Sequence, residues 1–168
     1  MRYCDVAPSA NNEIDAFAEV AEEYCNWAEQ PSGSGIAEAR RARRLLIELL
    51  WRAVDLTSTF SEGDTKDVSN DLYQKLYARF GVLPFNYYSE CFDPLVIPPE
   101  EPVVADLADD LADIWRDVKV GLTLWYELKA SAAAWHWRFT FETHWGHHAS
   151  AALYALQSWF TQHVDSDE

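Results

Sequence analysis

The feature that most constrains the fold is a repeat of apolar residues along VVADLADDLADIWRDVKVGLTLWYELK, residues 103–129. Apolar side chains return every three or four positions, the spacing that gathers them on one face of an α-helix. We therefore expect an amphipathic helix that begins near Val103, ends near Lys129 and packs one face into a core. The residues expected on that face are Leu107, Leu111, Ile114, Val118, Leu122 and Trp125.

A ladder of aspartates follows the edge of the same face. It consists of Asp106, Asp109, Asp110, Asp113 and Asp117. At about 100° per residue, all of these except Asp109 fall on one stripe beside the buried face. Aspartate is a mediocre helix former and like charges four residues apart repel each other, so solubility alone does not explain the ladder. We infer that these carboxylates meet a partner, a metal ion or arginines of the same fold.

The rest of the chain predicts further helices at 13–30, 36–59, 69–81 and 131–163. Asn11 or Asn12 is expected to cap the first of them and Ser69 the short third one. Gly146 is expected to interrupt or bend the last helix. No alternating pattern long enough to predict a strand competes with these helices.

The predicted fold is all-α, an antiparallel helical bundle of four long helices plus one shorter helix. A segment near 83–102, rich in proline and aromatic residues, is expected to cross the bundle as ordered irregular structure. The length of 168 residues predicts a single all-helical domain over 1–168, with a frayed tail at 163–168.

Charge and cysteine content narrow the environment and the partners. The formal charge of −15 opposes binding to nucleic acid or to an anionic membrane surface, and no apolar run is long enough to span a bilayer. The three cysteines form neither a CxxC pair nor a secreted disulfide framework, which favours a reducing compartment. We expect a soluble cytoplasmic protein whose partner is another protein or a small molecule.

One basic cluster stands out against this acidic background. Arg40, Arg41, Arg43 and Arg44 open the second helix. Two interpretations remain open: ion pairs to the aspartate ladder, or capture of an anionic ligand.

Histidines near the C-terminus provide a second set of polar candidates. His144 and His148 are four residues apart, so both imidazoles project from one face of a helix. With Asp110 and Asp113 they would form a mixed nitrogen and oxygen site suited to zinc, manganese or iron. The alternative, which the sequence favours, is that they hydrogen-bond to the aspartates without a metal ion. His136 is expected on the exposed side.

The same helix carries an acid and a base on its predicted apolar side. That side is set by Trp135, Phe139 and Gly146, and Arg138 and Glu142 project from it four residues apart. A pair that faces a core is costly unless other groups satisfy it. Glu142 therefore has three open interpretations: a partner for Arg138, a partner for an arginine of the second helix, or a carboxylate that faces a ligand.

Three segments also resemble a known family: YYSECFDPL at 87–95, LADDLADIWRDVKVGL at 107–122 and WHWRFTFETHWGHHASAALYAL at 135–156. They are similar to DUF5063, a bacterial domain of unknown function, chiefly in the C-terminal half. Trp115 replaces the family's usual tyrosine and His147 its usual acidic or polar residue. The resemblance implies an all-helical single domain and brings no established reaction, cofactor or substrate. The matching positions are Phe92, Asp93, Pro94, Asp109, Asp110, Asp113, Asp117, Glu142, His144, Trp145, Gly146 and His148.

Three functions are compatible with these observations. The first is a binding or interaction module with a polar site of aspartate, histidine and tryptophan. The second is a divalent-metal-dependent hydrolase acting on a phosphoanhydride or nucleotide, with Glu19, Glu22 and Glu23 as opposing acids. The third is a purely structural polar network. No nucleophile or cofactor motif decides whether the protein is an enzyme. The candidate binding residues are Asp109, Asp110, Asp113, Asp117, Arg44, Arg138, Glu142 and Trp145.

Overall fold

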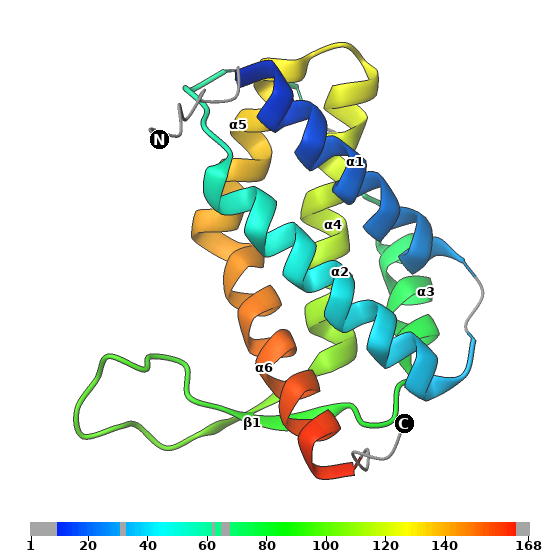
Figure 1. The fold of residues 1–168 in the computed structure, drawn as a ribbon, viewed down its shortest axis with the longest axis vertical. Helices are drawn as coiled ribbons and strands as arrows, with labels where there is room; N and C mark the ends of the chain where they lie inside the picture. The colour runs from blue at the N-terminus through cyan, green and yellow to red at the C-terminus, as the bar shows by residue number, and fades with distance from the viewer. Residues whose placement is uncertain (1–9, 31–32, 62, 65–67, 164–168) are drawn as a thin grey trace, which may run out of the picture.

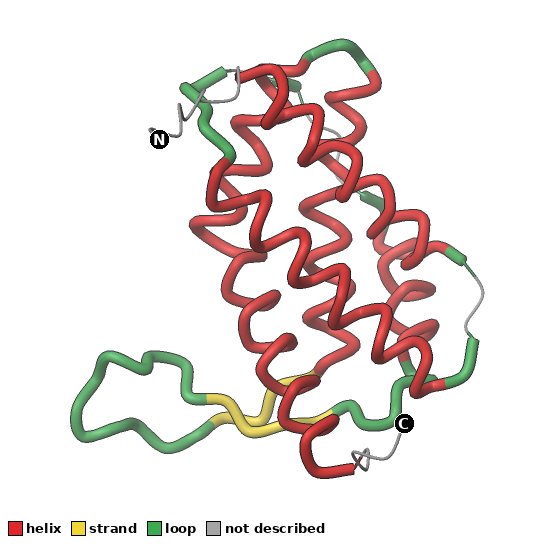
Figure 2. Tube along the Cα trace, viewed as in Figure 1, coloured by secondary structure: helices red, strands yellow, loops and turns green. Residues whose placement is uncertain are grey.

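The structure is a computed structural model that describes residues 10–30, 33–61, 63–64 and 68–163. Within these ranges the fold is a bundle of helices, as the sequence predicts (Figures 1 and 2). None of the described helices is both long and apolar enough to cross a membrane. The helical elements are α1 (Ala10–Glu29), α2 (Gly35–Asp55), α3 (Asn70–Phe80), α4 (Leu107–Tyr126), α5 (Ala130–Thr140), the π-helical turn η1 (Phe141–Trp145) and α6 (Gly146–His163).

Helix α4 lies at the centre of this arrangement and contacts α1, α3, α5 and α6. Neighbouring long helices run in opposite directions, so the prediction of an antiparallel bundle is confirmed (Figure 1). The apolar face of α4 is also as predicted, because its leucine, isoleucine and valine positions are buried, and Trp125 packs half-buried against the same core. Trp27, Trp115, Trp137 and Trp145 are fully buried in this core. These large aromatic side chains bury much of the apolar area that drives folding.

The expectation of a wholly irregular crossing segment is wrong. Strand β1 (Tyr87–Glu90) pairs in antiparallel register with β2 (Val103–Asp106), and the hairpin projects from one end of the bundle (Figure 2). The predicted start of the acidic helix at Val103 is therefore four residues early. Pro102 and the β-branched Val103 and Val104 favour extended backbone. Each strand has only four residues, too few for an alternating pattern to show in the sequence.

The sequence predicted some of the residues that cap the helices and missed others. Ser69 caps α3 as predicted, since its side chain accepts a hydrogen bond from the Leu72 amide. Asp106, predicted inside the acidic helix, is instead its N-cap and accepts from the amides of Ala108 and Asp109. The caps predicted at Asn11 and Asn12 are wrong because α1 begins at Ala10. Two helices end earlier than expected, α2 at Asp55 and α4 at Tyr126, and residues 164–168 of the predicted tail lie outside the described residues.

The interruption predicted at Gly146 is the π-turn η1, which ends just before it. A π-turn inserts one extra residue and so rotates the side chains that follow. This shift explains why Trp137 and Trp145 are buried, whereas Trp135 is only half-buried and Phe139 is exposed. The apolar side predicted for a regular helix is therefore wrong for the residues of α5, which precede the π-turn. A Cβ at Gly146 would lie 2.3 Å from the Phe141 carbonyl oxygen, so this close approach requires glycine.

Helices α4 and α5 approach each other closely at Gly121. The indole Nε1 of Trp137 donates a 3.0 Å hydrogen bond to the Val118 carbonyl oxygen, and a Cβ at Gly121 would lie 2.0 Å from that nitrogen. A side chain at this position would push the indole out of the core and break its hydrogen bond.

We therefore expect Gly121→Ala to lower the free energy of unfolding by about 1–3 kcal/mol, the usual effect of overpacking a core. Urea denaturation followed by circular dichroism measures the change. Gly81→Ala is the matched control, because Gly81 has ordinary helical backbone angles and is exposed. Equal unfolding midpoints for Gly121→Ala and the wild type would show that the contact is not tight.

Candidate functional site

The aspartates of α4 contact polar side chains from four other elements, and together these residues form the candidate site. Histidines come from η1 and α6, and tyrosines from α3 and β1. Asp110 and Asp113 are only 5% and 8% exposed. Buried carboxylates require hydrogen bonds or cations to remain ionised. The partners of each carboxylate therefore define what the site can bind.

Two histidines are held by two of these aspartates in the same way. Nδ1 of His148 lies 2.8 Å from an oxygen of Asp110, and Nδ1 of His144 lies 2.7 Å from an oxygen of Asp117. The rings lie edge to face with centroids 4.8 Å apart. Because Nδ1 of each ring donates to a carboxylate, Nε2 of each ring is left for a further ligand.

Asp113 lies beside this pair of rings. Its Oδ2 is 3.7 Å from Nε2 of His148, and Asp113, His144 and His148 each place a ligand atom within 4.8 Å of the other two. Nitrogen and oxygen donors in this combination suit zinc, manganese or iron. The spatial convergence of the acids with the two imidazoles, which the sequence only suggested, is present in the structure.

A frame of tyrosines fixes the carboxylates from the other side. The Tyr73 hydroxyl lies 2.7 Å from Asp109 and 3.0 Å from Asp113, and Tyr88 donates a 2.7 Å hydrogen bond to Asp110. Burial and these carboxylates raise the pKa of Tyr73 and of Tyr88 well above the usual value, so both phenols remain donors. Sequence reasoning missed them; the only signal is the spacing of Tyr73 and Tyr77 on one face of α3, where Tyr77 donates to Asp106.

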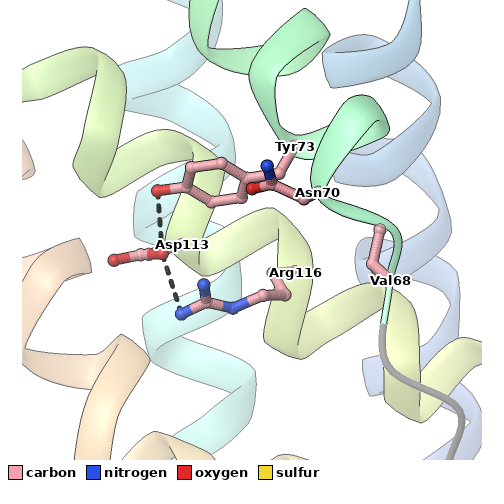
Figure 3. A pocket seen from close by; sticks show the side chains of 5 residues that line it. All are labelled: Val68, Asn70, Tyr73, Asp113 and Arg116. Atoms are coloured by element: carbon pink, nitrogen blue, oxygen red, sulfur yellow. Dashed lines mark hydrogen bonds and ion pairs between the residues drawn. The ribbon is translucent and has the colours of Figure 1, made fainter.

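Arg116 and an open pocket complete this side of the site. The guanidinium lies 2.9 Å from Oδ1 of Asp113 and 5.3 Å above the Tyr73 ring (Figure 3). Val68 and Asn70 line the remainder of the pocket, which has a volume of about 520 Å³. Oδ1 of Asp113 contacts Tyr73 and Arg116 in the wall of the pocket, while Oδ2 lies 3.7 Å from Nε2 of His148, so Asp113 is the residue that the pocket and the histidine pair share.

The site carries more negative than positive charge. The contacts described above include four carboxylates, those of Asp109, Asp110, Asp113 and Asp117, but one arginine, Arg116, which pairs with Asp113. The hydrogen bond to Asp110 raises the pKa of His148, and this effect outweighs burial, which lowers it. A protonated His148 or a bound cation would each relieve the excess negative charge.

Several predicted site residues lie elsewhere. Arg44 pairs with Glu23 of α1 and with Glu48, so the interpretation that the basic cluster pairs with the aspartates is wrong. Trp145 is fully buried against Phe17 in the core.

Arg138 and Glu142 also lie outside the candidate site. They pair with each other, and Arg138 also donates to the Ala53 and Val54 carbonyl oxygens at the end of α2. The expectation that this pair faces the core is wrong, because Glu142 is exposed and Arg138 only half-buried.

The other polar residues near the site have partners of their own. Glu22 accepts a hydrogen bond from Tyr126, and Glu23 accepts one from Arg44. Both acids therefore have partners outside the candidate site. His136, expected to be exposed, is half-buried with Nε2 3.1 Å from the Asp117 carbonyl oxygen. His147 pairs with Glu90 of β1 at 2.7 Å, which ties the hairpin to α6.

The fold and the site together define a helical-bundle protein with a tyrosine-framed cluster of aspartate and histidine. The chain belongs to the DUF5063 family, a domain of unknown function, whose model matches residues 8–162. The match extends the predicted resemblance from the C-terminal half to nearly the whole chain.

A solved structure shares this fold. The crystal structure of protein BF1032 from Bacteroides fragilis matches with a TM-score of 0.75 at 17% sequence identity, covering 94% of this chain and 97% of the other. No curated protein has a significantly similar sequence.

The raised pKa of His148 predicts a measurable pH dependence in chelator-treated protein. A histidine with a raised folded-state pKa stabilises the fold below its unfolded value of about 6.5 and loses this contribution as pH rises through the folded value. We expect Asp110→Asn to lower the pKa of His148. The titration is followed through the NMR resonances of the imidazole ring. Asp117→Asn is the control, since Asp117 contacts His144 instead. An unchanged titration in Asp110→Asn would contradict the assigned cause.

Proposed function

We propose that this protein binds one divalent transition-metal ion through Asp113, His144 and His148, and presents it to a small-molecule ligand. The observation that carries the proposal is the orientation of the two imidazoles. Each is held at Nδ1 by a carboxylate, so that its other nitrogen is directed away from that carboxylate beside Asp113. Carboxylates that hold the far nitrogen of a metal-bound histidine are a regular feature of metal sites.

The spacing of two of the donors, on His148 and Asp113, supports a metal ion. The 3.7 Å between His148 Nε2 and Asp113 Oδ2 is too long for a hydrogen bond. It matches the separation of two ligands on one ion, because metal–ligand bonds of about 2.0–2.2 Å place neighbouring donors about 3–4 Å apart. The surplus of carboxylates adds an electrostatic reason for a cation at this point.

Three protein donors leave coordination positions for water or a ligand. Asp113 lies in the wall of the pocket shared with Arg116, so a bound small molecule would lie next to the ion. This arrangement supports the binding module predicted from the sequence, with a metal ion as part of its site. Hydrolysis by a metal-activated water is the enzymatic form of the same proposal. Its ligands would be Asp113 and the histidines, and the glutamates of α1 would have no part in it.

We expect the wild type to bind one Zn²⁺ or Mn²⁺ per chain, measured by isothermal titration calorimetry and by elemental mass spectrometry of the purified protein. His144→Ala, His148→Ala and Asp113→Asn should each abolish stoichiometric binding. Because the imidazoles must be unprotonated to bind, affinity should rise with pH between about 6 and 8. Asp110→Asn and Asp117→Asn should weaken binding by about 10–100-fold, since they orient the histidines.

His147→Ala is the matched control, because His147 neighbours His148 in sequence but pairs with Glu90 of the hairpin. It should bind metal like the wild type. Absence of stoichiometric metal binding in the wild type, or equal loss in His147→Ala, would overturn the proposal and leave a structural network of hydrogen bonds.

A further inference from the structure

Helix α2 carries an exposed stripe that no described element covers. At about 100° per residue its members project within one narrow sector of the helix. Two arginines lie between exposed apolar side chains along it, and Trp51 is 59% exposed. Arg40 and Arg44 line a shallow pocket on this helix. We call this surface the α2 stripe; it consists of Ile36, Arg40, Arg44, Ile47, Trp51 and Val54.

The β1–β2 hairpin carries the opposite combination. Its tip is strongly apolar and exposed, with Leu95 at 88% and Ile97 at 84%. The whole stretch from Gly81 to Trp115 contains no lysine or arginine. We call residues 92–104 of the hairpin the acidic finger; its exposed acids are Asp93, Glu100 and Glu101, and its exposed large apolar residues are Phe92, Leu95, Val96, Ile97, Val103 and Val104.

The acidic finger is anchored to the bundle at its base. Glu90 pairs with His147 of α6, and the Phe92 ring packs 5.1 Å from the same imidazole. The Asp93 side chain accepts a 2.9 Å hydrogen bond from the Leu95 amide and so shapes the turn. Because these contacts fix the acidic finger, it loses little conformational entropy when a partner binds it.

We propose that the acidic finger of one copy of this chain docks on the α2 stripe of a second copy. Both surfaces expose large apolar side chains, and a solvent-exposed apolar cluster of this kind is typical of an interaction site. Their charges are complementary, because arginines rim one surface and carboxylates the other. Arg40 and Arg44 of the stripe are two of only 13 basic residues in a chain of net charge −15. The chain therefore provides its own partner for an acidic finger.

The arrangement of the bundle suits a reciprocal contact. In Figure 1 the N-terminal half of α2 crosses the near side of the bundle at the same end as the hairpin, and the hairpin extends sideways from that end. A two-fold axis parallel to the long axis of the bundle would bring each finger to the N-terminal half of the α2 stripe, at Ile36, Arg40 and Arg44, of the other copy. Such a contact is closed, because every finger and every stripe is used once. This inference does not depend on metal binding.

The test is the oligomeric state of the full chain, measured by sedimentation velocity between about 1 and 100 µM, the range in which specific interfaces of ordinary size associate. We expect a dimer for the wild type. Leu95→Asp with Ile97→Asp on the finger, or Ile36→Glu on the stripe, should each raise the dissociation constant at least tenfold. Circular dichroism confirms that each variant is folded.

Charge reversal distinguishes this interface from other modes of association. Glu100→Arg with Glu101→Arg should weaken the dimer, as should Arg40→Glu with Arg44→Glu, because each places like charges opposite one another. The four substitutions together should restore it. Tyr154→Asp is the matched control, since Tyr154 is an exposed aromatic of α6 outside both surfaces. A monomeric wild type, or a dimer that both reversals leave unchanged, would overturn the proposal.

Discussion

The structure depends above all on the burial of α4. This helix is surrounded by α1, α3, α5 and α6, so almost every turn of it meets another helix. Its apolar positions supply the core, and the same packing draws the carboxylates at its edge out of bulk water. Asp110 and Asp113 are therefore buried as a consequence of the apolar packing beside them. Everything distinctive about the candidate site follows from this enforced burial, because buried carboxylates need partners.

The hydrogen-bond partners of these carboxylates belong to distant parts of the chain. Tyr73 comes from α3, Tyr88 from the hairpin and His148 from α6, and all three meet aspartates of α4. The hydrogen bonds fix the rotamers of the carboxylates, and the carboxylates in turn fix the imidazole rings. This network orients both rings through Nδ1, and we therefore propose a metal ion where the sequence favoured metal-free hydrogen bonding.

Sequence patterns located the helices well, but they missed the strand before α4 and the π-turn in the last helix. The repeat in α4 gave its buried face correctly, but the preference of Val103 and Val104 for extended backbone overrode the helical pattern at its start. The π-turn at Phe141–Trp145 rotated the last helix, so Arg138 and Glu142 lie outside the core. A regular period cannot anticipate an inserted residue, because the rotation depends on contacts between helices rather than on the local sequence.

The sequence by itself determined the all-α class, the central acidic helix and the faces on which its aspartates and the C-terminal histidines lie. These follow from short-range periodicity, which the backbone geometry of a helix converts directly into faces. Only the tertiary structure decided that Arg44 pairs with Glu23, that tyrosines frame the site, and that a hairpin projects from the bundle. Such contacts join residues far apart in the chain, and their partners are selected by the packing of whole helices, which no local pattern encodes.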